Sequence, residues 1–218
     1  MSQLQLFQSD PLPWQNQAFL CVDTETTGLD KTQDRVIEVA WVMFKNQTEQ
    51  FSQARLCSID NALPAEITKL TGISDSMIQG QSPFAAHADD LIEAMSKAEF
   101  IVAYNADFDR LFLEAEMARI GKKMPDLSWV DPCTFIREID RYQKGKKLSD
   151  ASARWGIELK DAHRAMADAK ATGLLLYKLA PRLKPTMLPE LMKMQEVWRI
   201  EQDRNFKAYL ARKQQQTF

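Results

Sequence analysis

Asp161-Ala-His-Arg-Ala-Met-Ala-Asp-Ala-Lys-Ala-Thr-Gly-Leu-Leu-Leu176 is the stretch of sequence on which the expected fold rests. Its small and apolar side chains predict a helix that can lie close against a sheet, with most of its surface buried. Asp168 lies in the middle of this helix, and a buried, unpaired carboxylate requires a cation, a metal or a proton. No Lys or Arg of the stretch is an obvious partner, so a metal ion is the candidate partner of Asp168. Its other ligands would then come from the rest of the chain.

His163 lies five residues before Asp168. On one helix these side chains would point about 140° apart, so both cannot face one site from within it. We therefore place His163 in the loop or first turn ahead of the helix, from where it can reach over a site into which Asp168 points. Asp161 is available as the N-cap.

The composition is that of a soluble globular protein, with 45% hydrophobic and 27% charged residues among 218. No apolar run of 18 or more residues and no signal peptide is found, so we expect no membrane segment and a cytoplasmic protein. Cys21, Cys57 and Cys133 lack metal-ligand spacing and are interpreted as reduced core thiols. Only two histidines occur, which excludes a site built from several of them and favours a metal held by oxygen.

The net charge of −2 conceals an asymmetry along the chain. Residues 178–218 contain nine Lys/Arg and four Asp/Glu, a net charge of +5, so the preceding part carries −7. An acidic body with a basic tail fits a carboxylate site whose polyanionic substrate is held by positive charge elsewhere. A solvated amphipathic helix explains the tail alone equally well.

Residues 1–18 show no periodic pattern and are expected to form an N-terminal arm. Within it, Gln3, Leu4, Leu6 and Phe7 form a motif that resembles the short peptide by which many bacterial proteins dock on the replicative sliding clamp. Such a peptide inserts two apolar anchors into a hydrophobic groove. A short strand or a disordered end is the alternative.

Two carboxylates follow a short apolar run that predicts a buried strand over residues 19–22. Asp23 and Glu25 are two residues apart, so they project to the same side of that strand and repel each other unless a cation lies between them. Further strands are expected at 35–44, 50–57, 100–104 and from 129, with helices at 64–70, 83–98, 105–120, from 131, and 147–155. The first three strands form an antiparallel meander, and the later alternation of strands and helices predicts parallel additions.

Asp109 falls in the first turn of the helix expected from residue 105, where the helix dipole favours an ionised carboxylate. Asp107 is the better candidate for its N-cap. Asp109 as a mere stabiliser of the helix terminus is an alternative to a role in a site. A helical piece over residues 187–213 has an apolar surface and must either fold back or meet a partner.

Three segments together, Asp23-Thr-Glu-Thr-Thr-Gly-Leu29, Tyr104-Asn-Ala-Asp-Phe-Asp109 and His163-Arg-Ala-Met-Ala-Asp-Ala169, resemble the motifs of the DEDDh family of 3′–5′ exonucleases. This family includes the proofreading epsilon subunits of bacterial replicases, ribonuclease T and oligoribonuclease. The resemblance covers residues 19 to about 180, in order and at family-like spacing. It implies an α/β, ribonuclease H-like fold with a mixed five-stranded sheet, three strands antiparallel and two parallel, flanked by helices.

The resemblance also implies two Mg²⁺ or Mn²⁺ ions and a role for each motif residue. Asp23 would bridge both ions, Glu25 and Asp168 would complete the site of the ion that activates water, and Asp109 would support the site. His163 would be the general base, a role that suits a histidine of near-neutral pKa. The family's substrate contacts map onto Thr26, Gly28, Leu29, Thr71, Ile73 and Asn105. The basic loop with Lys144, Lys146 and Lys147 either meets phosphates or is a solvated turn.

The sequence thus predicts a metal-dependent 3′–5′ exonuclease that acts on nucleic acid with a free 3′ end, with DNA favoured because of the clamp-like arm. An RNA-trimming enzyme with the same chemistry is one alternative, and a non-catalytic nucleic-acid or clamp-binding module is another. We expect an arm over 1–18, an exonuclease domain over 19–183 and a basic helical extension over 184–218.

Overall fold

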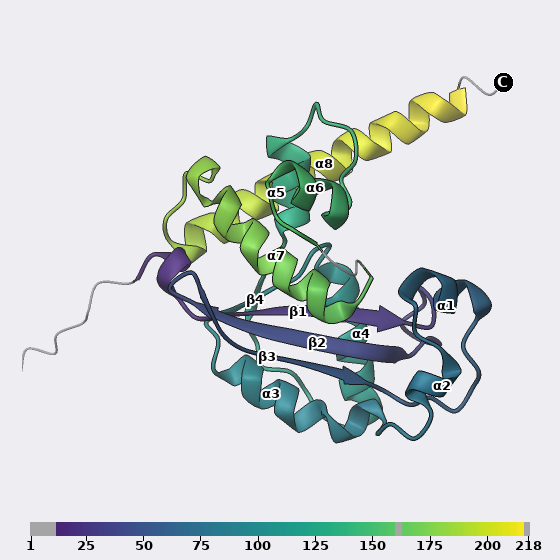
Figure 1. Cartoon of the computed structure of the whole chain (residues 1–218). Helices are drawn as coiled ribbons and strands as arrows, with labels where there is room; N and C mark the ends of the chain where they lie inside the picture. Colours follow the sequence, from purple (N-terminus) through teal and green to yellow (C-terminus); the bar gives the residue numbers. More distant parts are fainter. Residues whose placement is uncertain (1–11, 160–162, 216–218) are drawn as a thin grey trace, which may run out of the picture.

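The computed structural model describes residues 12–159 and 163–215 of the chain (Figure 1). The clamp-like motif with Gln3, Leu4, Leu6 and Phe7 lies outside the described residues, as does Asp161. Among the helices that are described, none is both long and apolar enough to cross a membrane.

A mixed five-stranded sheet forms the centre of the molecule. Its strands are β1 (Phe19–Thr26), β2 (Val36–Lys45), β3 (Thr48–Leu56), β4 (Phe100–Val102) and β5 (Ser128–Val130), in the order β3-β2-β1-β4-β5. The first three are antiparallel, β4 is parallel to β1, and β5 is parallel to β4. The predicted meander with two parallel additions is therefore confirmed.

Helices cover both faces of this sheet (Figure 1). They are α1 (Ala65–Thr71), α2 (Asp75–Ile78), α3 (Ala88–Ser96), α4 (Asp107–Arg119), α5 (Pro132–Ile139), α6 (Leu148–Arg154), α7 (Ala165–Leu179) and α8 (Leu188–Gln215), with 3₁₀ turns η1 (Trp14–Asn16), η2 (Phe84–Ala86) and η3 (Ala180–Arg182). One core cluster joins α7 to the face of β1 that carries Phe19 and Cys21. A second cluster joins α3 and α4 to the opposite face, which carries Leu20 and Val22. The alternation of side chains along β1 thus supplies both layers of the core.

Helix α7 lies close to the sheet because its facing side chains are small. A Cβ atom added at Gly173 would be 2.4 Å from Cε2 of Phe44 and 2.7 Å from Sγ of Cys21. The expected burial of this helix is confirmed, and the missing side chain at Gly173 allows a close approach to the sheet. Cys21, Cys57 and Cys133 are buried free thiols, as predicted.

Two helix starts differ from the expected ones, and one short helix was not expected. Asp107 is the first residue of α4 and not its N-cap, which is Ala106. The side chain of Asp107 instead forms an ion pair with Arg110, 3.1 Å away, one turn along the same helix. Helix α7 begins at Ala165 with Arg164 at its N-cap position, and the predicted cap, Asp161, is outside the described residues. The four-residue helix α2 was not expected, because so short an element shows no periodic pattern.

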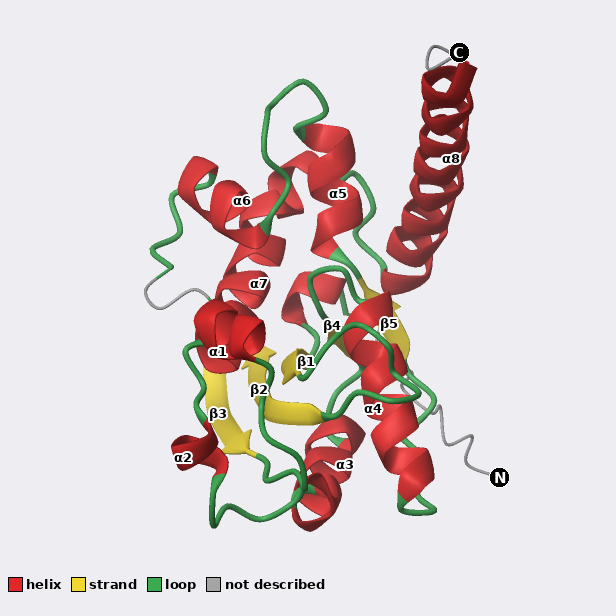
Figure 2. Cartoon of the chain, turned by 90° about the vertical axis from the view of Figure 1, so that its right-hand side faces the viewer, coloured by secondary structure: helices red, strands yellow, loops and turns green. Residues whose placement is uncertain are grey.

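The first half of the C-terminal helix α8 packs against the core of α7, and its C-terminal part extends away from the rest of the molecule (Figures 1 and 2). Leu191 is fully buried in the core cluster of α7, and the ring of Trp198 meets that of Phe135 edge-on at 6.0 Å. Phe206 and Tyr209, farther along, are exposed. The division of the chain at residues 18 and 183 stays a prediction.

Candidate active site

Asp23 and Glu25 lie near the C-terminal end of β1. Their side chains point to the face of the sheet that α7 covers. Cys21, two residues earlier, packs in the α7 cluster, and side chains two apart on a strand share a face. In the register of β1 with β2, Asp23 is opposite Ala40 and Glu25 is opposite Glu38. The predicted common orientation of the two carboxylates is therefore confirmed.

Helix α7 brings Asp168 and His163 to the same place. Glu25, His163 and Asp168 each offer one ligand atom, and these atoms lie within 4.8 Å of one another. His163 precedes the helix, as predicted, with a positive φ of 69°. Asp168 lies in the first turn and not in the middle of the helix, because α7 begins only at Ala165. The main-chain N–H of His163 donates to Oδ2 of Asp168 at 3.2 Å, which fixes the histidine segment to the helix.

Asp109 approaches the end of β1 from α4, on the opposite face of the sheet. It is 3% exposed, and its Oδ1 accepts hydrogen bonds from the main-chain N–H of Thr24 at 2.9 Å and the hydroxyl of Thr24 at 2.8 Å. Because Thr24 stands between Asp23 and Glu25, Asp109 is tied to the strand that bears both carboxylates.

Burial and mutual repulsion raise the pKa values of the clustered carboxyl groups. Burial, followed by the charges of Asp109, Asp168 and Glu25, raises the pKa of Asp23 well above its ordinary value. Burial and the charge of Asp168 raise the pKa of Glu25 to about 8. Burial raises the pKa of Asp109 to about 7, despite the Thr24 hydrogen bonds that lower it. Desolvation is thus the largest influence on the Asp109 carboxyl group in the metal-free protein.

These residues fit a divalent cation. Oδ1 of Asp168 is buried and has no hydrogen-bond partner within the part of the chain that the structure describes. Several carboxylates whose charges raise one another's pKa values are stabilised by a cation placed among them. Oxygen ligands are those that Mg²⁺ and Mn²⁺ prefer. Asp23, Glu25, Asp109 and Asp168 could hold such ions at the end of β1.

Glu38 is a buried carboxylate of the site region that the sequence reasoning missed. It is 2% exposed, and it accepts hydrogen bonds from Arg164 at 3.0 and 3.3 Å and from the main-chain N–H of Ala165 at 3.0 Å. It therefore attaches the start of α7 to β2, immediately after His163. The signal was its position as the single charged residue within the apolar run Val36-Ile-Glu-Val-Ala-Trp-Val-Met-Phe44.

The residues expected to contact substrate divide into exposed and buried ones. Leu29 is 87% exposed in the loop that follows β1. Asn105 is exposed in a left-handed conformation with φ of 66°, and its main-chain N–H donates to Asp131 at 2.9 Å. Thr26 is buried, and its hydroxyl donates to the carbonyl of Gly28 at 2.6 Å.

Thr71 and Ile73 are buried at the end of α1. The hydroxyl of Thr71 donates to the carbonyl of Ile67 at 2.9 Å and accepts from the main-chain N–H of Ile73 at 3.1 Å. The side chain of Ile73 packs with Ile37 and Leu63 in a small core cluster. These residues shape the corner after α1 and do not present their side chains to solvent.

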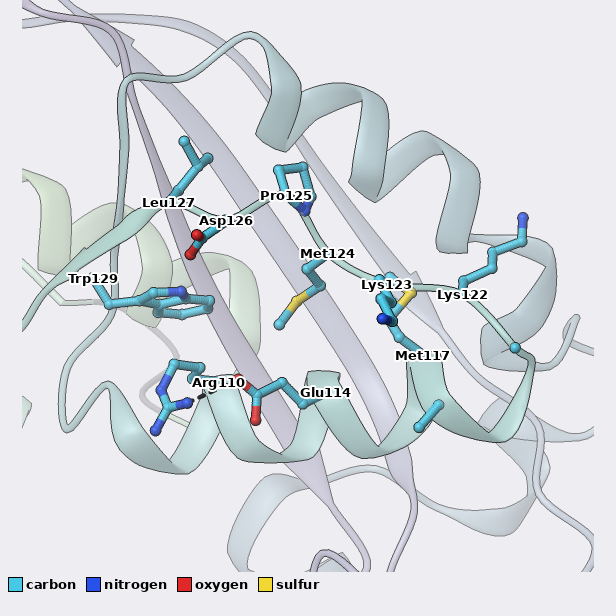
Figure 3. A pocket seen from close by; sticks show the side chains of 12 residues that line it. Arg110, Glu114, Met117, Lys122, Lys123, Met124, Pro125, Asp126, Leu127 and Trp129 are labelled. Carbon is cyan, nitrogen blue, oxygen red and sulfur yellow. Dashed lines mark hydrogen bonds and ion pairs between the residues drawn. The ribbon is translucent and has the colours of Figure 1, made fainter.

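Two further features lie apart from the carboxylates. The ammonium group of Lys146 donates a hydrogen bond to the main-chain carbonyl of Gln143, 2.7 Å away, within the loop itself. A cavity of about 710 Å³ between α4 and residues 121–127 is lined by Met117, Met124 and Trp129 among others (Figure 3). None of the predicted site residues lines this cavity, so its size is no indication of where substrate binds.

Comparison with known proteins identifies related sequences. Residues 20–176 match the family model of the RNase T type, described as exonuclease. The chain is 32% identical over 184 residues to the 3′-5′ exonuclease DinG of Bacillus subtilis, covering 83% of this chain and 19% of that protein. It is 32% identical over 165 residues to the PolC-type DNA polymerase III of Listeria welshimeri, covering 76% of this chain and 11% of that protein. The chain thus spans a fifth or less of the length of these relatives.

Solved structures share the fold. E. coli exonuclease I, in complex with a dT13 oligonucleotide, superposes with a TM-score of 0.68 at 22% identity, over 82% of this chain and 43% of that one. Exonuclease X in complex with 5′ overhanging duplex DNA superposes with a TM-score of 0.60 at 21% identity, over 80% of this chain and 99% of that one. The sheet and its flanking helices therefore have the ribonuclease H-like architecture that the motifs implied.

Proposed function

Because the chain belongs to the RNase T exonuclease family, we propose that it is a metal-dependent 3′–5′ exonuclease of the DEDDh type. It hydrolyses the terminal phosphodiester bond of a strand with a free 3′ end, releases a 5′-mononucleotide and leaves a new 3′-hydroxyl. The observation that carries this proposal is the convergence of Glu25, His163 and Asp168 within 4.8 Å at the end of β1.

Four carboxylates divide the work of holding the metal site. Asp23, Glu25 and Asp168 would supply ligand oxygens from β1 and α7, and Asp109 would support the site from α4 through its hydrogen bonds to Thr24. Two Mg²⁺ or Mn²⁺ ions, when bound, stabilise the negative charge that develops on the attacking and leaving oxygens.

His163 is the proposed general base. Its ring accepts a proton from the attacking water, and its exposed position ahead of α7 gives it access to both solvent and the carboxylates. The segment is held by its main-chain hydrogen bond to Asp168 and, one residue later, by Arg164 on Glu38. The proposed base and the proposed ligand Asp168 are therefore both attached to the start of α7.

DNA is the proposed substrate. The curated relatives are a 3′-5′ exonuclease and DNA polymerases, and the solved neighbours were crystallised with DNA, which supports this choice over RNA. Leu29, Gly28 and Asn105 lie in loops around the carboxylates and are proposed to contact the 3′-terminal nucleotide. Thr26, Thr71 and Ile73 are buried, and we propose that they support the residues that contact this nucleotide.

The deciding experiment compares 3′-ended DNA and RNA oligonucleotides of equal sequence, labelled at the 5′ end, with purified protein and Mn²⁺ or Mg²⁺. We expect stepwise shortening of DNA that is faster than that of RNA, and none with Asp23→Ala. Faster shortening of RNA would assign the protein to RNA trimming. If the wild-type protein releases no nucleotide under any of these conditions, the remaining hypothesis is a non-catalytic nucleic-acid-binding module.

Three further proposals concern the protein's context. Gln3, Leu4, Leu6 and Phe7 are proposed to bind a bacterial sliding clamp. Residues 19–183 are proposed as the exonuclease domain, between an arm and a basic helical extension. The three buried free thiols are those of a protein in a reducing compartment, which we propose to be the cytoplasm.

A further inference from the structure

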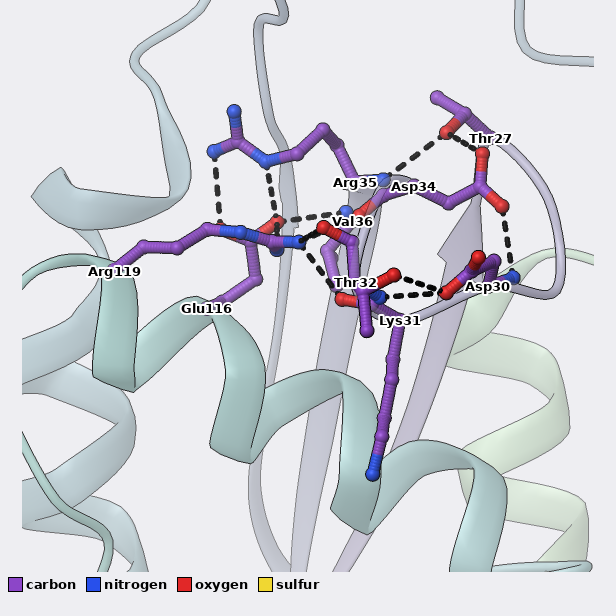
Figure 4. A network of polar contacts seen from close by, with 9 residues as sticks. All are labelled: Thr27, Asp30, Lys31, Thr32, Asp34, Arg35, Val36, Glu116 and Arg119. Carbon is purple, nitrogen blue, oxygen red and sulfur yellow. Dashed lines mark hydrogen bonds and ion pairs between the residues drawn. The ribbon is translucent and has the colours of Figure 1, made fainter.

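Glu116 is a buried carboxylate of α4 that takes no part in the proposed chemistry. It lies seven residues after Asp109, on the same side of the helix, and is 1% exposed. Its oxygens accept hydrogen bonds from Arg35 at 2.8 and 3.0 Å and from the main-chain N–H of Val36 at 3.1 Å, and Arg119 forms an ion pair with it at 3.1 Å (Figure 4). A buried ion cluster contributes little net stability once its desolvation is counted, so its role is better sought in the segments that it holds in place.

Arg119 connects this cluster to the loop between β1 and β2, residues 27–35. While Nη1 of Arg119 contacts Glu116, Nη2 lies 2.7 Å from the carbonyl oxygen of Lys31 and 3.2 Å from those of Thr32 and Asp34. A planar guanidinium can serve both partners at once, which a lysine ammonium cannot do in the same geometry. The loop is thereby attached to α4 through its main chain, independently of its side chains.

Asp34 stabilises the same loop through hydrogen bonds to other residues of the loop. Its carboxylate accepts hydrogen bonds from the hydroxyl of Thr27 at 2.9 Å and from the main-chain N–H of Asp30 at 2.8 Å. A Cβ atom at Gly28 would lie 2.4 Å from Oδ2 of Asp34, so only glycine permits this approach. Both ends of the loop and its middle are therefore fixed in the described structure.

Leu29 is the side chain that this fixed loop exposes. It lies four residues after Glu25 and is 87% exposed, although the main chain on both sides of it is hydrogen-bonded. An apolar side chain held rigidly in solvent beside a site is prepared to contact an apolar surface of a ligand, such as the face of a base. Fixing it in advance removes an ordering cost that binding would otherwise incur.

We infer that Arg35, Glu116 and Arg119 form a positioning cluster that holds Leu29 beside the carboxylate site for the 3′-terminal nucleotide. This inference rests on the proposed exonuclease function. The cluster acts through the loop and touches neither substrate nor metal, so its loss raises KM and leaves kcat nearly unchanged.

The test compares Arg119→Ala with Arg110→Ala, a matched control on the same helix whose ion pairs within the described residues are to Asp107 and Glu114. We expect Arg119→Ala to raise KM about tenfold with kcat within about twofold, and Arg110→Ala to change neither. Arg119→Lys should rescue less than half of the loss, because it cannot bridge Glu116 and the loop. Asp34→Ala leaves the ion pairs of Glu116 with Arg35 and Arg119 intact and should raise KM in the same way. It is the second test of the inference if the Arg119→Ala protein fails to fold.

Combining variants and measuring loop exchange separates positioning from general damage. Leu29→Ala should raise KM by itself, and adding Arg119→Ala to it should cause little further increase. Hydrogen exchange of the amides of residues 30–36 should accelerate in Arg119→Ala and not in Arg110→Ala. An unchanged KM in Arg119→Ala, or full additivity with Leu29→Ala, overturns the inference. If the wild type releases no nucleotide, the proposed function fails, and the exchange of these amides together with the oligonucleotide affinity of the same variants decides the positioning role.

Discussion

Gly173→Ala tests whether the close approach of α7 to the sheet positions the site. The added methyl group would lie 2.4 Å from Cε2 of Phe44 and 2.7 Å from Sγ of Cys21, both of which are buried. Carbon contacts are most favourable at about 3.5–4.0 Å, so helix and sheet must separate by about 1 Å. The displaced helix carries Asp168, which lies in its first turn.

The expected change in stability is the difference of two effects. Replacing glycine by alanine inside a helix stabilises it by about 1 kcal/mol. Overpacking a well-filled core costs about 1–3 kcal/mol, and contact with two buried groups places this case at the upper end. We therefore expect the free energy of unfolding to fall by about 2 kcal/mol, which corresponds to a Tm lower by roughly 4–8 °C for a protein of this size.

Urea unfolding and initial rates of nucleotide release provide the measurements. Leu174→Ala, the next and partly exposed residue of the same helix, is the control and should change stability by less than about 0.5 kcal/mol. Phe44→Leu shortens the ring that the methyl group meets, so Gly173→Ala should cost at least about 1 kcal/mol less in that background. A Gly173→Ala protein that is more stable than wild type, with no coupling to Phe44→Leu, would refute the reasoning.

Three other outcomes follow from the site. Glu38→Ala should lower kcat at least about tenfold with little change in KM, because Arg164 and the start of α7 lose their hydrogen-bond acceptor beside His163. Glu38→Gln should retain part of the rate. Equal losses of kcat in the two variants would contradict this role of Glu38. The raised pKa of Asp109, about 7, contributes stability to the metal-free protein that is present below the unfolded-state pKa and is lost as pH rises through the folded-state value. The metal-free free energy of unfolding should therefore fall by about 2–4 kcal/mol more between about pH 4 and pH 8 in wild type than in Asp109→Asn, and Mg²⁺ should reverse the difference; equal urea-unfolding profiles of the two would contradict it. Capture of a bacterial sliding clamp should be lost on Leu6→Ala with Phe7→Ala, and unchanged capture would remove the clamp proposal.

The sheet could be predicted from the sequence because its signals are local. Apolar runs of strand length predict β1 and β2, and the turn between β2 and β3 contains Asn46 and Gln47, polar residues that both have positive φ. Asp23 and Glu25 could be assigned to one side of β1 because the two-residue period of a strand is independent of tertiary structure.

Other features depend on contacts between distant segments and could not be predicted. Glu38 belongs to the site region only because β2 places it opposite Glu25 and α7 brings Arg164 to it. The raised pKa of Asp109 results from burial between α4 and β1, which its position near a helix N-terminus does not reveal. The boundary of α7 was misplaced for a related reason, since nothing in the alanine-rich sequence marks Arg164 as its N-cap.

The distances along the chain between the site residues have a consequence for biosynthesis. Glu25 and Asp168 are separated by 143 residues, and Thr24 and Asp109 by 85. Contacts of such long range form late in folding, because loop closure precedes them. A nascent chain that has completed β1, β2 and β3 still lacks α7 with Asp168 and the preceding His163. The proposed site is therefore incomplete until this helix has been synthesised and docks on the sheet.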